Sequence, residues 1–445
     1  MHFTILKEEK QMKNIFRLVR FDGFLFVVFC LFTTTNPLYA QWIPTNGPYG
    51  GHVNAFAVSP NGTGGTNLFA GTWGGVFLST NTGASWIEVN TGMTATSIYA
   101  FTVSPNGTGG TNLFAGTWAE GDFLSTDNGT NWIAVNNGLA NTFVNSLTFS
   151  GTNLFAGTAG GGIFLSTNNG TRWTAVNMGL TNSGEIAFAV FGTNLFAGTY
   201  GDGVFLSTNN GTSWTAASTG LTATYVRALT VSPDGTGGTN LFAGTSGGVF
   251  LSTNNGTSWA AASTGLTNLD VRAFAISGVN LFAGTSSTVF LSTDNGTSWT
   301  EVNTGLPNTD VYALIVNGTD LFIGTQGNGA GTSGYGIWRR SLSEMIMTQA
   351  VENAKLAPAH FALQQNYPNP FNPTTTISFS LPSKSFVSLK VFDLIGREVA
   401  TLLSQEKPAG TYKVTFDASK LPSGVYFYRF TAGDFRQVKK MLLIK

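Results

Sequence analysis

One short motif recurs seven times along the chain, and this repetition constrains the fold more than any other feature. The motif is Asn/Asp-Leu-Phe-Ala/Ile-Gly-Thr, and its copies begin at Asn67, Asn112, Asn153, Asn194, Asn240, Asn280 and Asp320. Successive copies lie 45, 41, 41, 46, 40 and 40 residues apart, which is a spacing typical of the blades of a β-propeller. The longer steps belong to units that carry an inserted Ser-Pro-Asn/Asp-Gly-Thr-Gly-Gly turn, which begins at Ser59, Ser104 and Ser232.

Each copy predicts four short strands separated by Gly, Asn and Pro turns. In the first unit we expect them at about 53–58, 67–72, 75–80 and 85–90. Seven units of four strands predict an all-β chain with a seven-bladed β-propeller over residues 41–342. A linear β-solenoid is the alternative, although its rungs are normally shorter than these units.

The two ends of the repeat array complement each other. The seventh copy has expected strands at 311–316, 320–325 and 336–340, but no fourth strand. The segment Trp42-Ile43-Pro44-Thr45-Asn46 resembles the fourth-strand pattern of the first copy, Trp86-Ile87-Glu88-Val89-Asn90. We therefore expect the N-terminal segment to complete blade seven and close the ring.

Charge is scarce and unevenly distributed. Residues 41–340 contain five Arg and no Lys against twelve Asp and Glu, whereas residues 341–445 contain twelve Lys and Arg against seven Asp and Glu. An acidic body without lysine cannot neutralise phosphates, so nucleic acid is excluded as its partner. The change in composition also marks a domain boundary near residue 342.

The first 40 residues have the pattern of a signal peptide. Lys13, Arg17 and Arg20 precede an apolar run over 24–32, and Ala40 offers a small residue for cleavage. Met12 is the expected start, because Glu8 and Glu9 in the stretch before it do not suit the basic beginning of a signal peptide. The run is too short to span a membrane comfortably, so no transmembrane segment is expected in the mature chain; a buried core helix is the alternative. The only cysteine, Cys30, lies in this segment.

A second motif, Ser-x-Asn/Asp-x-Gly-x-x-Trp, lies between the third and fourth expected strands of six copies. It resembles the Asp-box (BNR) repeat of sialidases, sortilin-like receptors and some glucan hydrolases, although Asn replaces Asp in four copies. An Asx side chain can bond its own turn and Trp can bury a large face, so these residues are predicted to be structural. The resemblance implies that they lie opposite the ligand face. They are Asn81 and Trp86, Asp127 and Trp132, Asn168 and Trp173, Asn209 and Trp214, Asn254 and Trp259, and Asp294 and Trp299.

Positions that differ between the copies are the candidate ligand contacts. One such register follows each Gly-Thr, and the other lies on the innermost strand; in a propeller both should face the mouth of the central channel. Exposed aromatic rings beside carboxylates suit stacking on sugar rings, although Trp73 and Trp118 could instead only pack against adjacent loops. The candidates in or near the first register are Trp73, Trp118, Tyr200, Glu120, Asp122 and Asp202, and those in the second are Tyr99, Arg227, Arg272 and Tyr312.

The sequence supports an enzymatic function less well than a binding function. The sialidase resemblance implies three arginines, a Tyr–Glu nucleophile and six blades, but only Arg227 and Arg272 share a register here. A glucan hydrolase needs two opposed carboxylates about 5–10 Å apart, for which Glu185 and Asp270 are further candidates by position. We therefore expect no catalytic residue, no cofactor and no bound metal.

The function predicted is that of a monomeric, non-catalytic propeller that binds a glycan or a protein partner. The alternative is a glycoside hydrolase, sialidase-like or glucan-cleaving, that uses carboxylates at the channel mouth. A third hypothesis is a purely structural surface-layer protein.

Beyond the repeats, residues 343–362 lack a strand pattern and are predicted to be a linker. Residues 363–445 alternate strands with Pro/Gly turns, which predicts a small β-sandwich. The sequence Asn-Tyr-Pro-Asn-Pro-Phe-Asn-Pro over 366–373, the pair Gly396-Arg397 and the basic, apolar end over 439–445 closely resemble the type A sorting domain of the type IX secretion system. The resemblance implies a Bacteroidetes-like bacterium, binding of this domain by the secretion machinery, and a secreted or outer-membrane-surface location.

Overall fold

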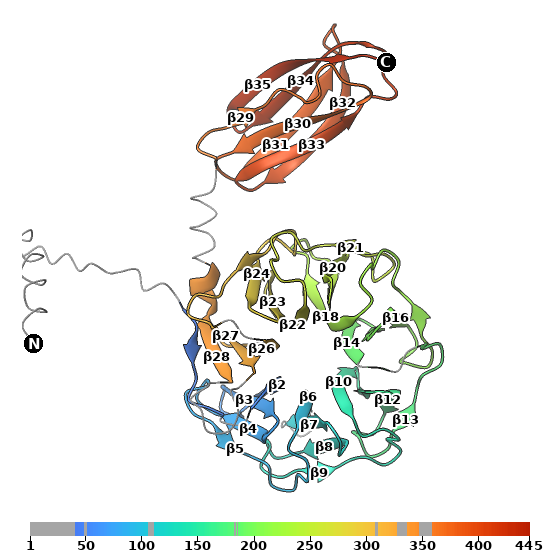
Figure 1. Cartoon of the computed structure of the whole chain (residues 1–445), viewed down its shortest axis with the longest axis vertical. Helices are drawn as coiled ribbons and strands as arrows, with labels where there is room; N and C mark the ends of the chain where they lie inside the picture. Colours follow the sequence, from blue (N-terminus) through green and yellow to red (C-terminus); the bar gives the residue numbers. More distant parts are fainter. Residues whose placement is uncertain are drawn as a thin grey trace, which may run out of the picture. The chain divides into compact units, whose positions relative to one another are not determined.

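Seven four-stranded antiparallel sheets form a ring in the computed structural model (Figure 1). The structure describes residues 41–48, 51–105, 111–181, 184, 186–307, 310–326, 336–346 and 358–445. The predicted signal peptide over 1–40 and residues 347–357 of the predicted linker lie outside the described residues. The seven-bladed propeller expected from the repeats is confirmed.

Each blade runs from an innermost strand to a short outermost strand. The innermost strands are β2 (Val53–Pro60), β6 (Ile98–Pro105), β10 (Val144–Ser150), β14 (Ile186–Phe191), β18 (Val226–Pro233), β22 (Val271–Ser277) and β26 (Val311–Asn317). The second strands are β3 (Thr66–Thr72), β7 (Thr111–Thr117), β11 (Asn153–Thr158), β15 (Asn194–Thr199), β19 (Thr239–Thr245), β23 (Asn280–Thr285) and β27 (Asp320–Thr325). The third strands are β4 (Gly75–Ser79), β8 (Asp122–Ser125), β12 (Gly162–Ser166), β16 (Gly203–Ser207), β20 (Gly248–Ser252), β24 (Val289–Ser292) and β28 (Ile337–Ser341). The outermost strands are β5 (Ile87–Glu88), β9 (Ile133–Ala134), β13 (Thr174–Ala175), β17 (Thr215–Ala216), β21 (Ala260–Ala261), β25 (Thr300–Glu301) and β1 (Ile43–Pro44).

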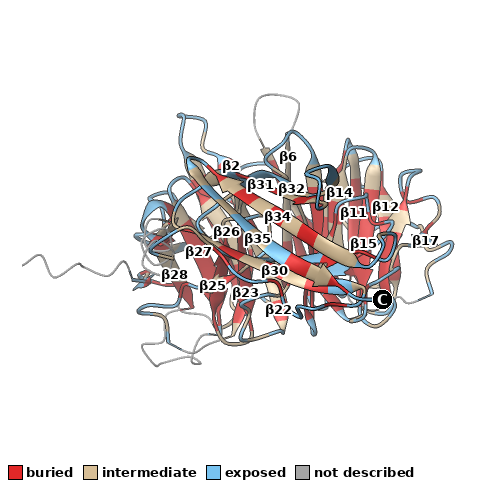
Figure 2. Cartoon of the chain, turned by 90° about the horizontal axis from the view of Figure 1, so that it is seen from above, coloured by how far each residue is buried: buried red, intermediate tan, exposed pale blue. Residues whose placement is uncertain are grey.

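The recurrent Leu-Phe-Ala-Gly-Thr segment forms the second strand, which is the most buried part of each blade (Figure 2). Both of its faces are covered, because each blade packs between two neighbours. The glycine is required by this packing: a Cβ on Gly71 would lie 2.6 Å from Ile98 Cγ2 at the start of the next blade. The equivalent glycine of every other blade meets a valine or isoleucine in the same way, which explains why the motif keeps its spacing and composition.

The Ser-x-Asx-x-Gly-x-x-Trp turns satisfy their own hydrogen bonds. In blade one, Ser79 Oγ donates to Asn81 Oδ1 (3.0 Å) and accepts from the Gly83 amide (2.8 Å). Asn81 Oδ1 also accepts from the Ser85 amide (2.9 Å). The same three bonds recur in the other five copies. In all six turns the Asx side chain therefore bonds the backbone of its own turn.

One position in these turns carries a residue poorly suited to its backbone. Thr82 adopts a φ of 54°, while the equivalent residue of the other five turns is Asn at φ 53–57°. A β-branched residue in the left-handed region is strained, whereas Asn tolerates it. We expect Thr82→Asn to raise the free energy of unfolding by about 1 kcal/mol, measured by denaturant melts. The reverse change, Asn210→Thr, should lower it by a similar amount, and a change of the same sign in both variants would contradict the strain argument.

The tryptophans of these turns join neighbouring blades. Trp132 in blade two donates its Nε1–H to the Val89 carbonyl of blade one (2.8 Å) and its amide to the Thr91 carbonyl (2.9 Å). Four further tryptophans, those of blades three to six, bind the preceding blade with the same pair of bonds. Trp86 is the exception: it is half-buried, and its Nε1 has no partner among the described residues.

The N-terminal segment closes the ring as expected. Strand β1 pairs with β28, placing Ile43 opposite Arg339 and Pro44 opposite Trp338. Trp42 is buried and donates its Nε1–H to the Val302 carbonyl of blade six (2.6 Å). Trp42 therefore takes in blade seven the place that the turn tryptophans take in blades two to six.

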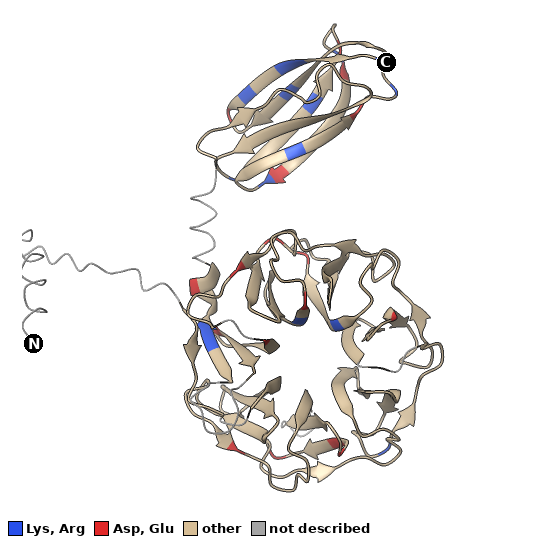
Figure 3. Ribbon diagram, in the orientation of Figure 1, with Lys and Arg blue, Asp and Glu red and all other residues tan. Residues whose placement is uncertain are grey.

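The C-terminal module is a β-sandwich, as predicted. One sheet orders β29 (Ala362–Leu363), β30 (Thr374–Leu381) and β33 (Gly410–Asp417). The other orders β32 (Glu398–Lys407), β31 (Ser385–Phe392), β34 (Gly424–Ala432) and β35 (Phe435–Leu443). Alternate residues of both sheets enclose a single apolar core. Charged side chains are sparse on the propeller and more frequent on this module (Figure 3). Within the described ranges, no helix has the length and apolar character needed to cross a bilayer.

Candidate functional site

A pocket of about 440 Å³ lies at one end of the ring, and every blade contributes to it. The antiparallel pairing of Val53 with Thr72, repeated in each blade, brings the start of the innermost strand beside the end of the second strand. The two variable registers therefore meet at one mouth. The lining residues are His52, Asn54, Trp73, Tyr99, Asn145, Ile186, Val226, Arg227, Arg272 and Tyr312.

An aromatic stack forms one wall. The His52 ring stacks on Trp73 with centroids 3.8 Å apart and an interplanar angle of 20°, and it lies 5.2 Å from the Tyr312 ring. Burial lowers the pKa of His52, an effect only partly opposed by the charge of Asp310, so the imidazole is neutral at pH 7. Trp73 remains 47% exposed. The stack thus presents a flat, uncharged and accessible surface.

The predicted aromatic residues Trp118 and Tyr200 pack close to the pocket without lining it. Trp118 lies 5.2 Å from Tyr99 and meets Phe143 edge-on at 5.0 Å. Tyr200 meets Tyr225 edge-on at 4.7 Å, with the Arg227 guanidinium 5.9 Å from its ring centroid. Both side chains keep about half of their surface exposed. They extend the aromatic rim outward from the pocket.

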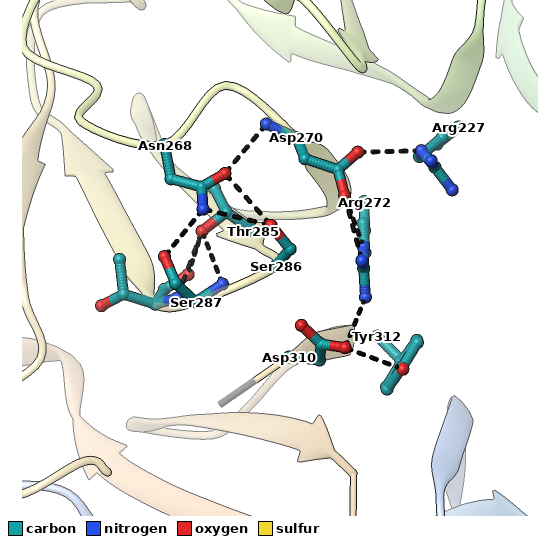
Figure 4. A network of polar contacts seen from close by, with 10 residues as sticks. Arg227, Asn268, Asp270, Arg272, Thr285, Ser286, Ser287, Asp310 and Tyr312 are labelled. Carbon is teal, nitrogen blue, oxygen red and sulfur yellow. Dashed lines mark hydrogen bonds and ion pairs between the residues drawn. The ribbon is translucent and has the colours of Figure 1, made fainter. Parts of the chain in front are cut away.

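A ladder of alternating charges runs across blades five, six and seven and reaches the aromatic stack at Tyr312 (Figure 4). Arg227 Nε pairs with Asp270 Oδ1 (3.0 Å), and Asp270 Oδ2 pairs with Arg272 Nη2 (3.0 Å). Arg272 Nη1 pairs with Asp310 Oδ2 (3.1 Å). The same oxygen accepts a hydrogen bond from the Tyr312 hydroxyl (3.1 Å). Two positive and two negative groups balance, so the wall is polar but carries no net charge.

The ladder changes the proton affinities of its members. Burial alone would lower the pKa of Arg272, but the carboxylates of Asp270 and Asp310 outweigh it and raise that pKa. Burial raises the pKa of Tyr312, and its hydrogen bond to Asp310 adds to the effect. Arg272 also donates from Nε to Asp270 Oδ2 (3.0 Å), so three contacts fix it on two carboxylates. Arg227, in contrast, engages Asp270 through Nε alone and leaves its Nη atoms without a protein partner among the described residues (Figure 4).

The three carboxylates predicted for the site lie elsewhere. Glu120 accepts a hydrogen bond from Thr94 (3.2 Å) and Asp202 from Thr181 (2.5 Å), and neither lines the pocket. The expectation that Asp122 faces the mouth is wrong, because its side chain is fully buried on β8. Burial raises its pKa well above the ordinary value. Glu185 lies outside the described residues.

The site contains four residues that the prediction did not select, and a fifth, Asp270, that it considered only as a carboxylate of a hydrolase. His52, Asn54 and Asn145 line the pocket, and Asp270 and Asp310 form the ladder. All five lie on or at the entrance of the innermost strands, so their register in the repeat could have identified them. The Asn145 amide is enclosed and has no hydrogen-bond partner among the described residues, so it is an unsatisfied polar group in the wall of the pocket. Within the same residues, no group of three or more His, Cys, Asp or Glu could hold a metal ion.

Solved structures share the propeller fold. The extracellular domain of BT3049 from B. thetaiotaomicron, described as a hybrid two-component system, superposes with a TM-score of 0.54 at 12% identity over 91% of this chain and 57% of that one. The corresponding domain of BT4673 gives 0.53 at 13% identity over 91% and 59%. YCF48 from Cyanidioschyzon merolae gives 0.50 at 16% identity over 68% and 99%. At these identities the likeness shows the fold alone, and this chain spans about three fifths of the two B. thetaiotaomicron chains.

None of the curated proteins compared with the chain matches its sequence. Residues 365–445, however, match the family model of the secretion system C-terminal sorting domain. This domain directs export by the type IX secretion system of Bacteroidetes, so the secretion machinery is a partner of the chain. The C-terminal β-sandwich is thus a sorting domain, and the chain is exported to the cell surface or the extracellular space.

Proposed function

We propose that the chain is an exported, non-catalytic β-propeller that binds a glycan or a protein partner at the mouth of its channel. The observation that carries this proposal is the pocket to which all seven blades contribute. It combines an accessible aromatic face at Trp73 with the Nη atoms of Arg227 and the enclosed amide of Asn145, which have no protein partner among the described residues. Concave sites with a flat apolar wall and a few convergent polar groups are typical of ligand binding.

Each group has a distinct role in this proposal. The Trp73 ring, backed by neutral His52, stacks against a sugar ring or a side chain of the partner. The Asn145 amide has two N–H donors and a carbonyl acceptor, and the Nη atoms of Arg227 offer further donors. Because each of the three side-chain nitrogens of Arg272 already pairs with Asp270 or Asp310, this residue holds the wall in place rather than binding the ligand.

The carboxylates argue for binding rather than hydrolysis. No carboxylate lines the pocket among the described residues. Asp270 and Asp310, which lie nearest to it in the ladder, both pair with the same guanidinium. A glycosidase of the usual kind needs two carboxyl groups facing the bond that is cleaved, and this wall does not offer such a pair.

The remaining assignments belong to the same proposal. The six self-bonded Ser-x-Asx-x-Gly-x-x-Trp turns support placing the propeller in the Asp-box (BNR) group. The domain division that we propose is a signal peptide over 1–40, a propeller over 41–342, a linker over 343–362 and a sorting domain over 363–445. The mature chain is proposed to act as a monomer.

The binding proposal is tested with a glycan array and a pull-down of surface proteins, using the purified chain and a Trp73→Ala/Trp118→Ala variant. Losing the stacking surface should weaken binding about tenfold or more, which corresponds to roughly 1.4 kcal/mol. Ile87→Ala is the matched control, since Ile87 is similarly exposed but lies on the outermost strand of blade one. Binding that survives the double variant would contradict the proposal, and sugar released from the array would favour the hydrolase instead.

A further inference from the structure

Two neighbouring aliphatic side chains protrude from the tip of a turn in the sorting domain. Leu394 and Ile395 lie between β31 and β32 and are 71% and 74% exposed. Single exposed apolar residues are common on protein surfaces, but an adjacent pair at a tip is a feature that needs a reason. We call this pair of side chains the knob.

The turn that carries the knob is held firmly. Asp393 Oδ1 accepts hydrogen bonds from the amides of Ile395 (3.1 Å) and Arg397 (2.9 Å), and its Oδ2 pairs with Arg397 Nε (2.7 Å). The Asp393 amide in turn donates to the Arg397 carbonyl (2.9 Å). At the base, Lys390 pairs with Glu398 across the two strands (2.9 Å). The backbone of the knob is therefore fixed before any partner arrives.

The turn itself does not require these two residues. Its geometry depends on Asp393, which bonds the backbone, and on Gly396, which has a φ of +83°. Other turns of the domain carry Ser383-Lys384 or Gly433-Asp434 at their tips. Leucine and isoleucine at an exposed tip add no local stability and expose apolar surface to water. Their presence is explained by a contact with another molecule.

We propose that the knob is a docking element through which the type IX secretion machinery recognises this domain, by inserting Leu394 and Ile395 into an apolar groove. The knob lies within residues 365–445, the part of the chain that matches the sorting-domain family, and that domain is the part the machinery must bind. A rigid pair of aliphatic side chains contributes binding energy at a small ordering cost.

The positive charge of the sorting domain favours a partner groove with an acidic rim. Arg397, directly beside the knob, is 75% exposed on its side chain. Residues 365–445 carry eleven Lys and Arg against five Asp and Glu. We therefore expect acidic groups at the rim of the groove, where opposite charge guides association. This proposal is independent of what the propeller mouth binds.

The test measures export of the full chain in a Bacteroidetes strain with a working type IX system. The Leu394→Ser/Ile395→Ser variant should reduce the fraction of protein found on the surface and in the medium about tenfold or more, as for the loss of an interface hot spot. The Phe386→Ser/Val438→Ser variant is the control, because both residues are at least half exposed in the same domain; its export should be unchanged. The Leu394→Met/Ile395→Val variant keeps an apolar tip and should be exported normally.

Several results would overturn the proposal. Normal export of the serine variant would do so, as would equal loss in the Phe386→Ser/Val438→Ser control. If the serine variant alone melts early after purification, loss of export in a Leu394→Gln/Ile395→Thr variant that melts like the parent supports the knob, and normal export of that variant contradicts it. A change in oligomeric mass or in propeller melting, with export intact, would assign the knob to a second copy or to this chain's own propeller.

Discussion

Replacing Trp42 with alanine is expected to lower the free energy of unfolding of the propeller by about 3–5 kcal/mol, the usual cost of emptying a buried tryptophan site. The side chain is 2% exposed and packs in the core that joins blades six and seven. Its Nε1–H also bonds the Val302 carbonyl (2.6 Å), which would keep only the hydrogen bond from Arg340 Nη1 (3.1 Å). Denaturant unfolding followed by tryptophan fluorescence and far-UV circular dichroism measures the change.

Trp86→Ala provides the matched control for the closure. Trp86 occupies the equivalent place in blade one, but it is only half-buried and makes no indole hydrogen bond among the described residues. Its loss should cost clearly less than the loss of Trp42. Equal costs for the two variants would show that the clasp, the closure of the ring by Trp42 and β1, contributes no more than an ordinary blade contact. Removal of residues 41–47 should lower the free energy of unfolding more than either substitution does, because it also removes β1.

Asp122→Val is expected to stabilise the propeller by about 3 kcal/mol, since it removes a buried polar group without a partner. Both carboxyl oxygens of Asp122 are enclosed and have no hydrogen-bond partner in the described structure. The six equivalent positions hold valine or isoleucine at 0% exposure: Val76, Ile163, Val204, Val249, Val289 and Ile337. The site is therefore already shaped for an aliphatic side chain, and denaturant melts at pH 7 measure the gain.

The gain should depend on pH in a defined direction. Burial raises the pKa of Asp122 in the folded chain, while in the unfolded chain it lies near 3.9. A raised folded pKa means that protonation favours the folded state, so the parent is most stable below about pH 4 and loses this stability as the pH rises through the folded pKa. The advantage of Asp122→Val should widen over that interval and then level off. An advantage that is constant from pH 4 to pH 8 would contradict the burial of an ionisable group.

Asp122→Asn separates the two contributions. Asparagine keeps the shape and the unpaired polar atoms but cannot ionise, so its stability relative to Asp122→Val should be independent of pH. We expect it to be less stable than the valine variant at every pH, because its amide remains without partners.

Much of the fold could be predicted because the same sequence pattern occurs seven times at a nearly constant spacing. The spacing of the Leu-Phe-Ala-Gly-Thr motif predicted the blades, and the likeness between the segments at Trp42 and Trp86 predicted the closure. The fourth strand was expected over 85–90 in blade one but covers only Ile87–Glu88. The residues before it continue the Ser-x-Asx turn and orient the tryptophan toward the preceding blade, so they do not pair.

The site was predicted less completely, for two physical reasons. Asp122 was assigned to the mouth because it lies close to Trp118 in sequence; aligning Gly121-Asp122-Phe123 with Gly75-Val76-Phe77 would have placed it on the buried face of β8. The charge ladder depends on which way long side chains turn across blade boundaries. Sequence register brings Arg227, Arg272 and Tyr312 to the same end, but it does not reveal that Asp270 and Asp310 lie between them.

The clasp also sets the order in which the ring can be completed. Thr45 bonds the Ile337 carbonyl across 292 positions of the chain, so the segment made first finds its partner only when the last blade exists. Blades one to six can each form from neighbouring residues, but the final closure is a long-range step whose entropic cost comes before any gain. Until then the growing chain carries an unpaired strand at one end and, once β28 forms, an open sheet edge at the other. Two chains at this stage could exchange their first strands, so closing within one chain must outpace meeting a second.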